Sequence, residues 1–578
     1  MYFPKLEGEQ TGYFQIDSFQ GLDLRESIPL GAFAQMENLT SDGFPVTCVR
    51  PRRRLLDTTS TQGGMTVRDG VCYVDGPDFV MNGWPVNIGL TEGKKELVSM
   101  GVYVLILPDK KYVNTLDKSD HGDIEAAFYS LDGVTFSVCR DSGEAYENLH
   151  KGDTPPEAPT EGQYWLDTSQ SPAGLKRWNS KEAVWETETS GCVRLSAPGI
   201  GRDFQAYDGV QITGIHIKAA EHLNGSAVIL ARDTDYLVIA GLVDGEVTQP
   251  LEQGVIAITR TMPELDYVVE AGNRLWGCRY GTDAQGQQVN EIYASKLGDF
   301  RNWSCFRGLS TDSYRASLGA DGAFTGAVNY MGSPLFFRED CIHKIYGSYP
   351  AEYRIQTTEC HGVARGSAKS LAVVDGVLYY LSNFGVCAYD GALPITVSQA
   401  WGRKRFYKGA AGGCGSKYYL SVLDEQEKSH LLVYDTAKGM WHREDDFYGV
   451  CFCTWGSLLV GYDGKNIYSM LADDPNQPPV TWMAQTGHLS SPDTHTRYIS
   501  RLSVKLRMEP GSRARFFVRY DGMGDWELLG SCEGKRLGIL RLPMRTRRCE
   551  SLQLRVEGEG AVQLHSITLN TRKGSDHS

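Results

Sequence analysis

The stretch that decides the fold is DGVLYYL at residues 375–381, followed by GVCAYDG at residues 385–391. Each half is a short apolar and aromatic run bounded by Gly or Asp-Gly, which is typical of two strands joined by a tight turn. GSLLVGY at 456–462 followed by NIYS at 466–469 repeats the pattern. Further copies are predicted at 67–84, 100–113, 271–295, 330–347 and 417–441.

The last five copies lie roughly 40–60 residues apart, a spacing expected of the four-stranded blades of a β-propeller. A single blade cannot bury both of its faces, whereas radial packing of several blades does. The sequence therefore predicts an all-β chain with a propeller of six or seven blades, formed by residues 61–120 and 263–475. An array of hairpins arranged as β-sandwiches is the alternative.

The regular spacing is interrupted by an inserted β-region at residues 121–262. A Pro-rich stretch at 151–159 opens a small tryptophan-rich module, predicted at 151–190, which carries Trp165, Trp178 and Trp185. This module resembles the small aromatic-bearing β-modules of chitinases and phage tail proteins. Its rings could stack on a sugar and bind glycan, or they could form the whole core of so small a unit. Residues 208–260 are expected to form another small β-domain.

The composition changes again near residue 476, and a C-terminal β-sandwich is predicted over 476–572. RLSVKLR at 501–507 alternates apolar and charged residues, as a strand with one buried and one solvated face does. Residues 1–60 are expected to form an N-terminal arm, and residues 573–578 a disordered tail.

Charge is distributed unevenly along the 578 residues. The net charge is −13, yet residues 497–556 contain 14 Lys/Arg against 6 Asp/Glu. This basic part is either an ordinary solvated surface or a face for an acidic neighbour or a polyanion. A second basic run, RPRRR at 50–54, suggests the same two uses. The arginines proposed for subunit or DNA contact are Arg50, Arg52, Arg53, Arg54, Arg501, Arg507, Arg519, Arg547 and Arg548.

The sequence predicts neither a metal nor a cofactor. The 14 cysteines form no Cys-x-x-Cys pair, and Cys451-Phe452-Cys453 is too closely spaced for an ordinary metal pair. No signal peptide and no membrane span are expected from the hydropathy pattern. These features suggest synthesis in a reducing cytoplasm with mostly free thiols.

Catalytic motifs are also missing, so the chain is not expected to be an enzyme. The sequence has no phosphate-binding loop, no His-Glu-x-x-His and no Gly-x-Ser-x-Gly. The turns at 130–136 and 521–526 are similar to the Asp-box of sialidases, but an ordinary hairpin turn explains both. A propeller glycosidase, which would need paired carboxylates, remains the least favoured alternative.

Several segments resemble bacteriophage virion proteins encoded by phages and prophages of Gram-positive gut bacteria. NLTSDGFP at 38–45, before the basic run, is similar to the opening of such proteins. NRLWGC at 273–278 with IYASKLGDFRNW at 292–303 resembles propeller proteins of the packaged-DNA stabilisation or tail-nozzle type, which seal the head–tail channel. The likeness covers roughly residues 1–120 and 262–470, and its motifs are structural turns.

This resemblance implies a structural component of a phage tail or neck, located in the virion and assembled in the cytoplasm of the bacterial host. The implied partners are other tail or neck proteins, further copies of the chain in a cyclic ring, with a hexamer expected, and packaged DNA in a channel. A tail-tip adsorption protein that binds host surface glycan through the inserted module is the second interpretation.

Overall fold

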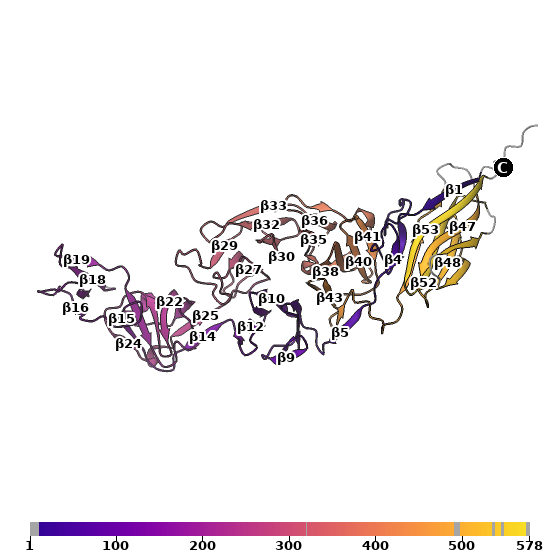
Figure 1. Ribbon diagram of the computed structural model, residues 1–578. Helices are drawn as coiled ribbons and strands as arrows, with labels where there is room; N and C mark the ends of the chain where they lie inside the picture. Colours follow the sequence, from indigo (N-terminus) through magenta and orange to yellow (C-terminus); the bar gives the residue numbers. More distant parts are fainter. Residues whose placement is uncertain are drawn as a thin grey trace, which may run out of the picture. The chain divides into compact units, whose positions relative to one another are not determined.

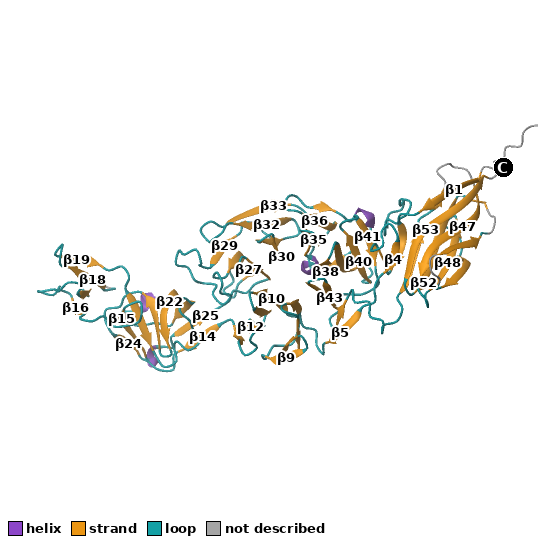
Figure 2. Cartoon of the chain, viewed as in Figure 1, coloured by secondary structure: helices purple, strands orange, loops and turns teal. Residues whose placement is uncertain are grey.

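The computed structural model describes residues 11–170, 172–319, 321–490, 497–534, 538–544 and 548–573. Within these ranges the chain is built from β-strands, with four short 3-10 helices (Figures 1 and 2). The helices are η1 (Glu221–Leu223), η2 (Leu251–Gln253), η3 (Ala368–Ser370) and η4 (Gln399–Trp401). The all-β prediction is therefore confirmed.

The chain folds into two compact units. The first comprises Met1–Glu96, Phe337–Ile342 and Thr357–Ser578, and the second comprises Leu97–Phe336 and His343–Gln356. Many four-stranded antiparallel sheets recur along both units, which is consistent with a propeller-like fold.

Four such sheets lie in the first unit. Their strands are β34 (Ala372–Val374), β35 (Val377–Ser382), β36 (Gly385–Tyr389) and β37 (Ile395–Thr396); β38 (Tyr407–Cys414), β39 (Lys417–Leu423), β40 (Ser429–Asp435) and β41 (Met440–Arg443); β42 (Cys451–Trp455), β43 (Leu458–Tyr462), β44 (Asn466–Ser469) and β5 (Arg54–Thr58); and β6 (Met65–Val67), β7 (Val71–Asp75), β8 (Asp78–Met81) and β9 (Trp84–Asn87). The hairpin quoted first above is β35–β36, and every residue of β36 is buried. Burial on both faces explains why these strands are continuously apolar.

The sheet that begins with β42 is completed from a distant part of the chain. Its fourth strand, β5, pairs antiparallel with β44. Val460, Tyr462 and Ile467 of this sheet pack against Met65 and Tyr73 of the sheet that follows β5. The N-terminal strand β5 thus completes the sheet of β42, β43 and β44. That sheet packs on the sheet of β6 to β9, as neighbouring blades of a propeller do.

Three more four-stranded sheets lie between β9 and β34 in the sequence. Their strands are β10 (Glu96–Met100), β11 (Tyr103–Leu107), β12 (Lys111–Asn114) and β13 (His121–Asp123); β26 (Tyr267–Ala271), β27 (Arg274–Thr282), β28 (Gln288–Ala294) and β29 (Tyr314–Ser317); and β30 (Gly326–Tyr330), β31 (Ser333–Phe337), β32 (Cys341–Tyr346) and β33 (Arg354–Glu359). Leu105 and Leu275 share one core between the first two of these sheets, and Trp276 and Phe336 share another between the second and third.

An insertion between β13 and β26 forms two sheets of its own. The larger has the order β14 (Ala126–Tyr129), β25 (Ala257–Arg260), β21 (Gly209–Thr213), β22 (Gly225–Asp233), β23 (Tyr236–Ala240), β20 (Cys192–Ser196), β15 (Val134–Cys139) and β24 (Val247–Gln249). The smaller has the order β16 (His150–Gly152), β17 (Tyr164–Asp167), β18 (Gly174–Asn179) and β19 (Val184–Thr187). Phe136, Ile212 and Leu237 belong to the core of the larger sheet.

A β-sandwich of two sheets contains the C-terminal strands. One sheet consists of β3 (Leu39–Thr40), β4 (Thr47–Val49), β53 (Val562–Lys573), β47 (Arg497–Met508) and β50 (Gly538–Pro543), with β1 (Thr11–Ile16) and β51 (Arg548–Cys549). The other consists of β2 (Phe33–Glu37), β45 (Thr481–Thr486), β52 (Ser551–Glu559), β48 (Arg513–Tyr520) and β49 (Glu527–Glu533), with β46 (Leu489–Ser490). Val504 from the first sheet and Phe516 from the second belong to one shared core.

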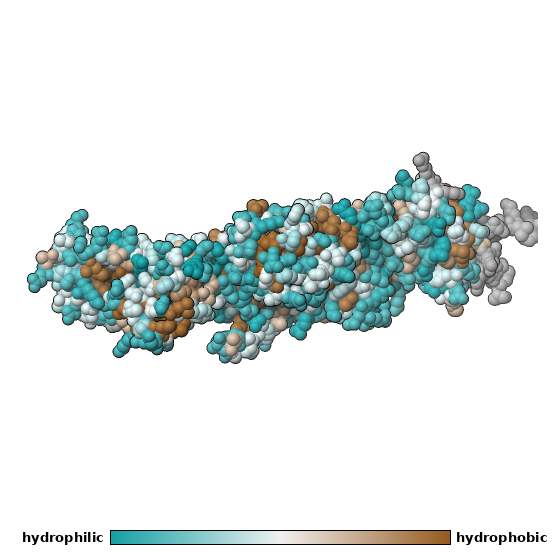
Figure 3. Space-filling view, turned by 90° about the horizontal axis from the view of Figure 1, so that it is seen from below, coloured by the Kyte–Doolittle hydropathy of each residue, from teal (hydrophilic) through white to brown (hydrophobic). Residues whose placement is uncertain are grey.

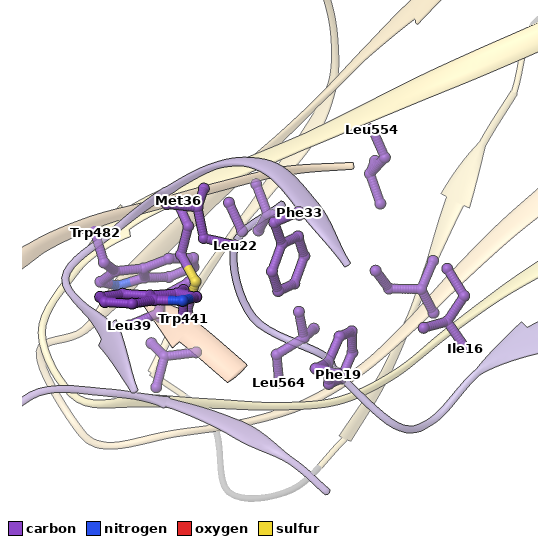
Figure 4. Close-up of a cluster of buried hydrophobic side chains, with 14 of the residues drawn as sticks. Ile16, Phe19, Leu22, Phe33, Met36, Leu39, Trp441, Trp482, Leu554 and Leu564 are labelled. Atoms are coloured by element: carbon purple, nitrogen blue, oxygen red, sulfur yellow. The ribbon is translucent and has the colours of Figure 1, made fainter. Parts of the chain in front are cut away.

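The N-terminal residues 11–58 do not form the separate arm expected from the sequence. Strands β1 and β4 pair with β53, and β2 pairs with β45. The reason is apolar burial, since Phe19, Phe33 and Met36 pack in the sandwich core near Trp441 and Trp482 (Figure 4). Residues 574–578 of the expected tail lie outside the described residues.

Candidate functional site

The tryptophan-rich module is a small sheet whose rings form one contiguous cluster. Trp178 on β18 lies directly opposite Trp185 on β19, and their ring centroids are 5.3 Å apart. Trp185 also contacts Trp165 on β17 with a ring separation of 5.5 Å. Cross-strand aromatic pairs of this kind stabilise a sheet that has little other apolar material.

The three rings differ in exposure. Trp165 is buried, and its indole Nε1 donates to the Gly152 carbonyl at 2.9 Å. Lys176 Nζ lies 4.5 Å from the centroid of the same ring and pairs with Asp167 at 2.8 Å. Hydrogen bonds from Lys176 and Ser169 lower the pKa of Asp167 to about 2. Trp165 is therefore a structural residue, whereas Trp178 and Trp185 remain half-exposed.

The basic run at residues 50–54 makes ion pairs within the chain. Arg53 donates to both Glu444 and Asp445 at 2.9 Å, and Arg50 contacts Asp445 at the same distance. Arg53 also lies over the ring of Phe447 at 4.8 Å. Arg50 and Arg53 are only 10% and 12% exposed, so most of their charge is used internally.

The same ion pairs determine the protonation of Asp445. Burial alone would raise the pKa of this carboxyl, but the charge and hydrogen bonds of Arg53, together with Arg50, outweigh burial and lower it. At the edge of the run, Arg52 contacts Asp473 at 3.2 Å, and Arg54 on β5 is exposed. A groove of about 570 Å³ runs beside these residues and is lined by Arg52, Asp446 and Pro478, among others.

The arginines of the sandwich are arranged differently. On β47, Arg501, Lys505 and Arg507 are exposed, while Leu502, Val504 and Leu506 between them are buried. This is the alternation expected from the sequence. Among the described residues, no carboxylate forms an ion pair with Arg501 or Arg507.

A histidine on β53 lies beside these positive charges. His565 on β53 has a pKa below the usual value, first because it is partly buried and then because of the charges of Lys505 and Arg507. We call Arg501, Lys505 and Arg507 the cationic strip.

The remaining predicted arginines lie elsewhere. Arg519 donates to Gln553 at 2.6 Å and lies over the ring of Trp526 at 4.8 Å, so it packs within its own sheet. The backbone of Arg548 belongs to β51, which pairs with β47. Arg547 lies outside the described residues.

The two turns that are similar to an Asp-box are structural. Asp521 accepts from the backbone N–H groups of Glu550 and Ser551 at 2.8 and 2.9 Å. The Ser130 hydroxyl accepts from the Ile256 N–H at 2.9 Å and joins the two ends of the inserted domain. Each polar side chain therefore holds a turn in place.

Two kinds of feature are absent from the described ranges. These ranges contain no group of three or more His, Cys, Asp or Glu side chains arranged to hold a metal ion. They also contain no helix with the length and apolar character that a membrane crossing requires. The visible surface in Figure 3 is mostly polar, with small apolar patches.

A feature that sequence reasoning dismissed is the pair Cys451 and Cys453. On β42 these residues are two apart, so both side chains point to the same face of the strand. Their Sγ atoms are 4.0 Å apart. The short spacing that seemed unsuitable for a metal therefore places the thiols next to each other.

Comparisons with known proteins give distant structural likenesses. No family model and no curated protein matches the chain. An exo-β-1,3-galactanase from Phanerochaete chrysosporium is 9% identical over 52% of this chain and 94% of its own, with a TM-score of 0.21. PorZ, a surface component of the type-IX secretion system of Porphyromonas gingivalis, is 10% identical over 89% of this chain and 71% of its own, with a TM-score of 0.25.

Proposed function

We propose that this chain is a structural component of a phage tail or neck, which forms an oligomeric ring and connects parts of the tail around the DNA channel. The proposal rests on the resemblance of its turn motifs to virion proteins and on the cationic strip. In this proposal the recurring four-stranded sheets are blades of a propeller of six or seven blades, which serves as a rigid scaffold.

The cationic strip is the observation that carries the proposal. Its Arg501 and Arg507 are presented on a rigid strand, point to solvent and have no carboxylate partner among the described residues. Arginine is suited to fixed contacts with carboxylate or phosphate groups across an interface. A neighbouring acidic subunit, or DNA in a channel, would supply the missing charge.

Assembly in the host tests this proposal. A phage or prophage encoding R501E/R507E should give particles that lack this protein, because the charge reversal repels an acidic neighbour. The matched control is R202E/R365E, which changes the same charge at exposed arginines outside the strip. Normal incorporation of R501E/R507E, together with a monomeric purified protein by native mass spectrometry, would refute the proposed role.

Glycan binding by the inserted module is the second candidate function. Trp178 and Trp185 lie side by side on adjacent strands and are half-exposed. Trp165 is buried in the module core and contacts Trp185. Two adjacent ring faces can stack on a sugar. We expect W178A and W185A each to abolish binding on an array of host cell-wall glycans, whereas W455A, at an exposed site outside the module, should not.

A further inference from the structure

The cysteine pair lies where two neighbouring sheets meet inside the first unit. Strand β42 is the first strand of its sheet and contacts β38 on one side and β6 on the other. The Sγ atoms of Cys451 and Cys453 lie 3.5 and 3.7 Å from the Met65 carbonyl oxygen of β6. Both residues are only partly buried.

An ion pair adjoins the two thiols. Lys369 of η3 contacts Glu96, the first residue of β10, at 2.5 Å. The charges of Lys369 and Glu96 both act on Cys451 and Cys453, and they act in opposite directions.

We propose that Cys451 and Cys453 form a two-thiolate site for one soft, monovalent metal cation, of which Cu(I) is the representative. Zinc–sulfur bonds are about 2.3 Å long, so two Sγ atoms that lie 4.0 Å apart are close enough for both to hold one ion of similar size. Little movement of either side chain is required.

The ligand set selects the kind of metal. Structural zinc takes four protein ligands and catalytic zinc takes three, whereas the described residues supply no such group here. Two thiolates without further ligands suit a soft ion, because sulfur ligands select Cu(I). Binding one Cu(I) releases the two thiol protons and leaves a complex of charge −1.

A disulfide is less suited to this geometry. Bridging requires Cβ atoms about 3.5–4.5 Å apart, whereas alternate residues of an extended strand are separated by two rises of about 3.4 Å each. A metal ion between the sulfurs needs no such approach of the backbone.

Anaerobic titration of the reduced, full-length protein with Cu(I), in competition with bicinchoninate, tests the site. The wild type should bind one tight equivalent that both C451S and C453S lose. C414S is the matched control, because Cys414 is a half-exposed thiol on the neighbouring strand β38, and it should keep the tight equivalent. Equal Cu(I) uptake by wild type and C451S would overturn the proposal.

Air oxidation gives a second test of the site. An air-oxidised protein in which mass mapping finds a Cys451–Cys453 disulfide, while the reduced protein binds no extra metal, would identify a redox pair and refute the metal site.

Discussion

The arginines of residues 50–53 and the arginines of β47 are the same residue type put to opposite uses. Arg50 and Arg53 are nearly buried and satisfied by Glu444 and Asp445. Arg501 and Arg507 are exposed and have no carboxylate partner within the described ranges. A dense basic run in a sequence is therefore weak evidence for an interface, because buried charges must be paired internally.

Removing the acids that neutralise Arg50 and Arg53 should have the largest effect. In E444Q/D445N the two guanidinium groups stay buried without a counter-charge, which typically costs about 3–5 kcal/mol. We expect the free energy of unfolding, measured by urea denaturation, to fall by about 4 kcal/mol. E425Q/E427Q, at exposed acids of the same sheet, should unfold like the wild type.

The tryptophan module can be compared in the same way, because Trp165 is buried whereas Trp178 and Trp185 are half-exposed. W165A removes a buried ring and should destabilise the module by about 3 kcal/mol, measured as faster amide hydrogen exchange in β17 and β18. W178A should leave exchange in β17 close to wild type. Equal protection losses in both variants would mean that all three rings are core residues.

Acid should lower the stability of the fold through His442, which is close in sequence to the acids that pair with Arg50 and Arg53. Burial and then the charge of Lys417 lower the pKa of His442 to about 3 from its usual 6.5. The unfolded chain therefore binds an extra proton between pH 6.5 and 3, and stability falls as the pH falls through this window. The slope should approach about 1.4 kcal/mol per pH unit.

Asp445 adds to this effect only at lower pH. Its folded pKa is below the usual value, so its contribution is present above about pH 4 and is lost as the pH falls through the folded pKa. Between pH 7 and pH 4, the urea midpoint of the wild type should fall relative to that of H442F, which has no imidazole to protonate. A pH-independent difference would show that His442 is not buried in its neutral form.

Charge reversal on the cationic strip should have the smallest effect on stability. R501E/R507E changes two exposed side chains, so unfolding should shift by less than about 0.5 kcal/mol. If the strip contacts DNA, the log–log salt slope of binding to a DNA probe should decrease by about 2. An unchanged slope would point to an acidic protein neighbour as the partner.

Local patterns predicted part of this structure from the sequence. The alternation in 501–507 correctly placed leucines inside and arginines outside, because a strand has a period of two. The run at 50–54 was misread, since Asp445 lies 392 residues beyond Arg53 and no local pattern connects them. The strands β1, β2 and β4 were missed for the same reason, because β1 and β4 pair with β53 and β2 pairs with β45.

The pairing of β1 with β53 also has a consequence for synthesis. Gly12 accepts a hydrogen bond from Thr571, 559 residues later. At translation rates of about 5–20 residues per second, the first strand waits roughly half a minute to two minutes for its partner. During this time its edge is open to wrong neighbours, so a chaperone that shields emerging strands should increase the yield of native protein.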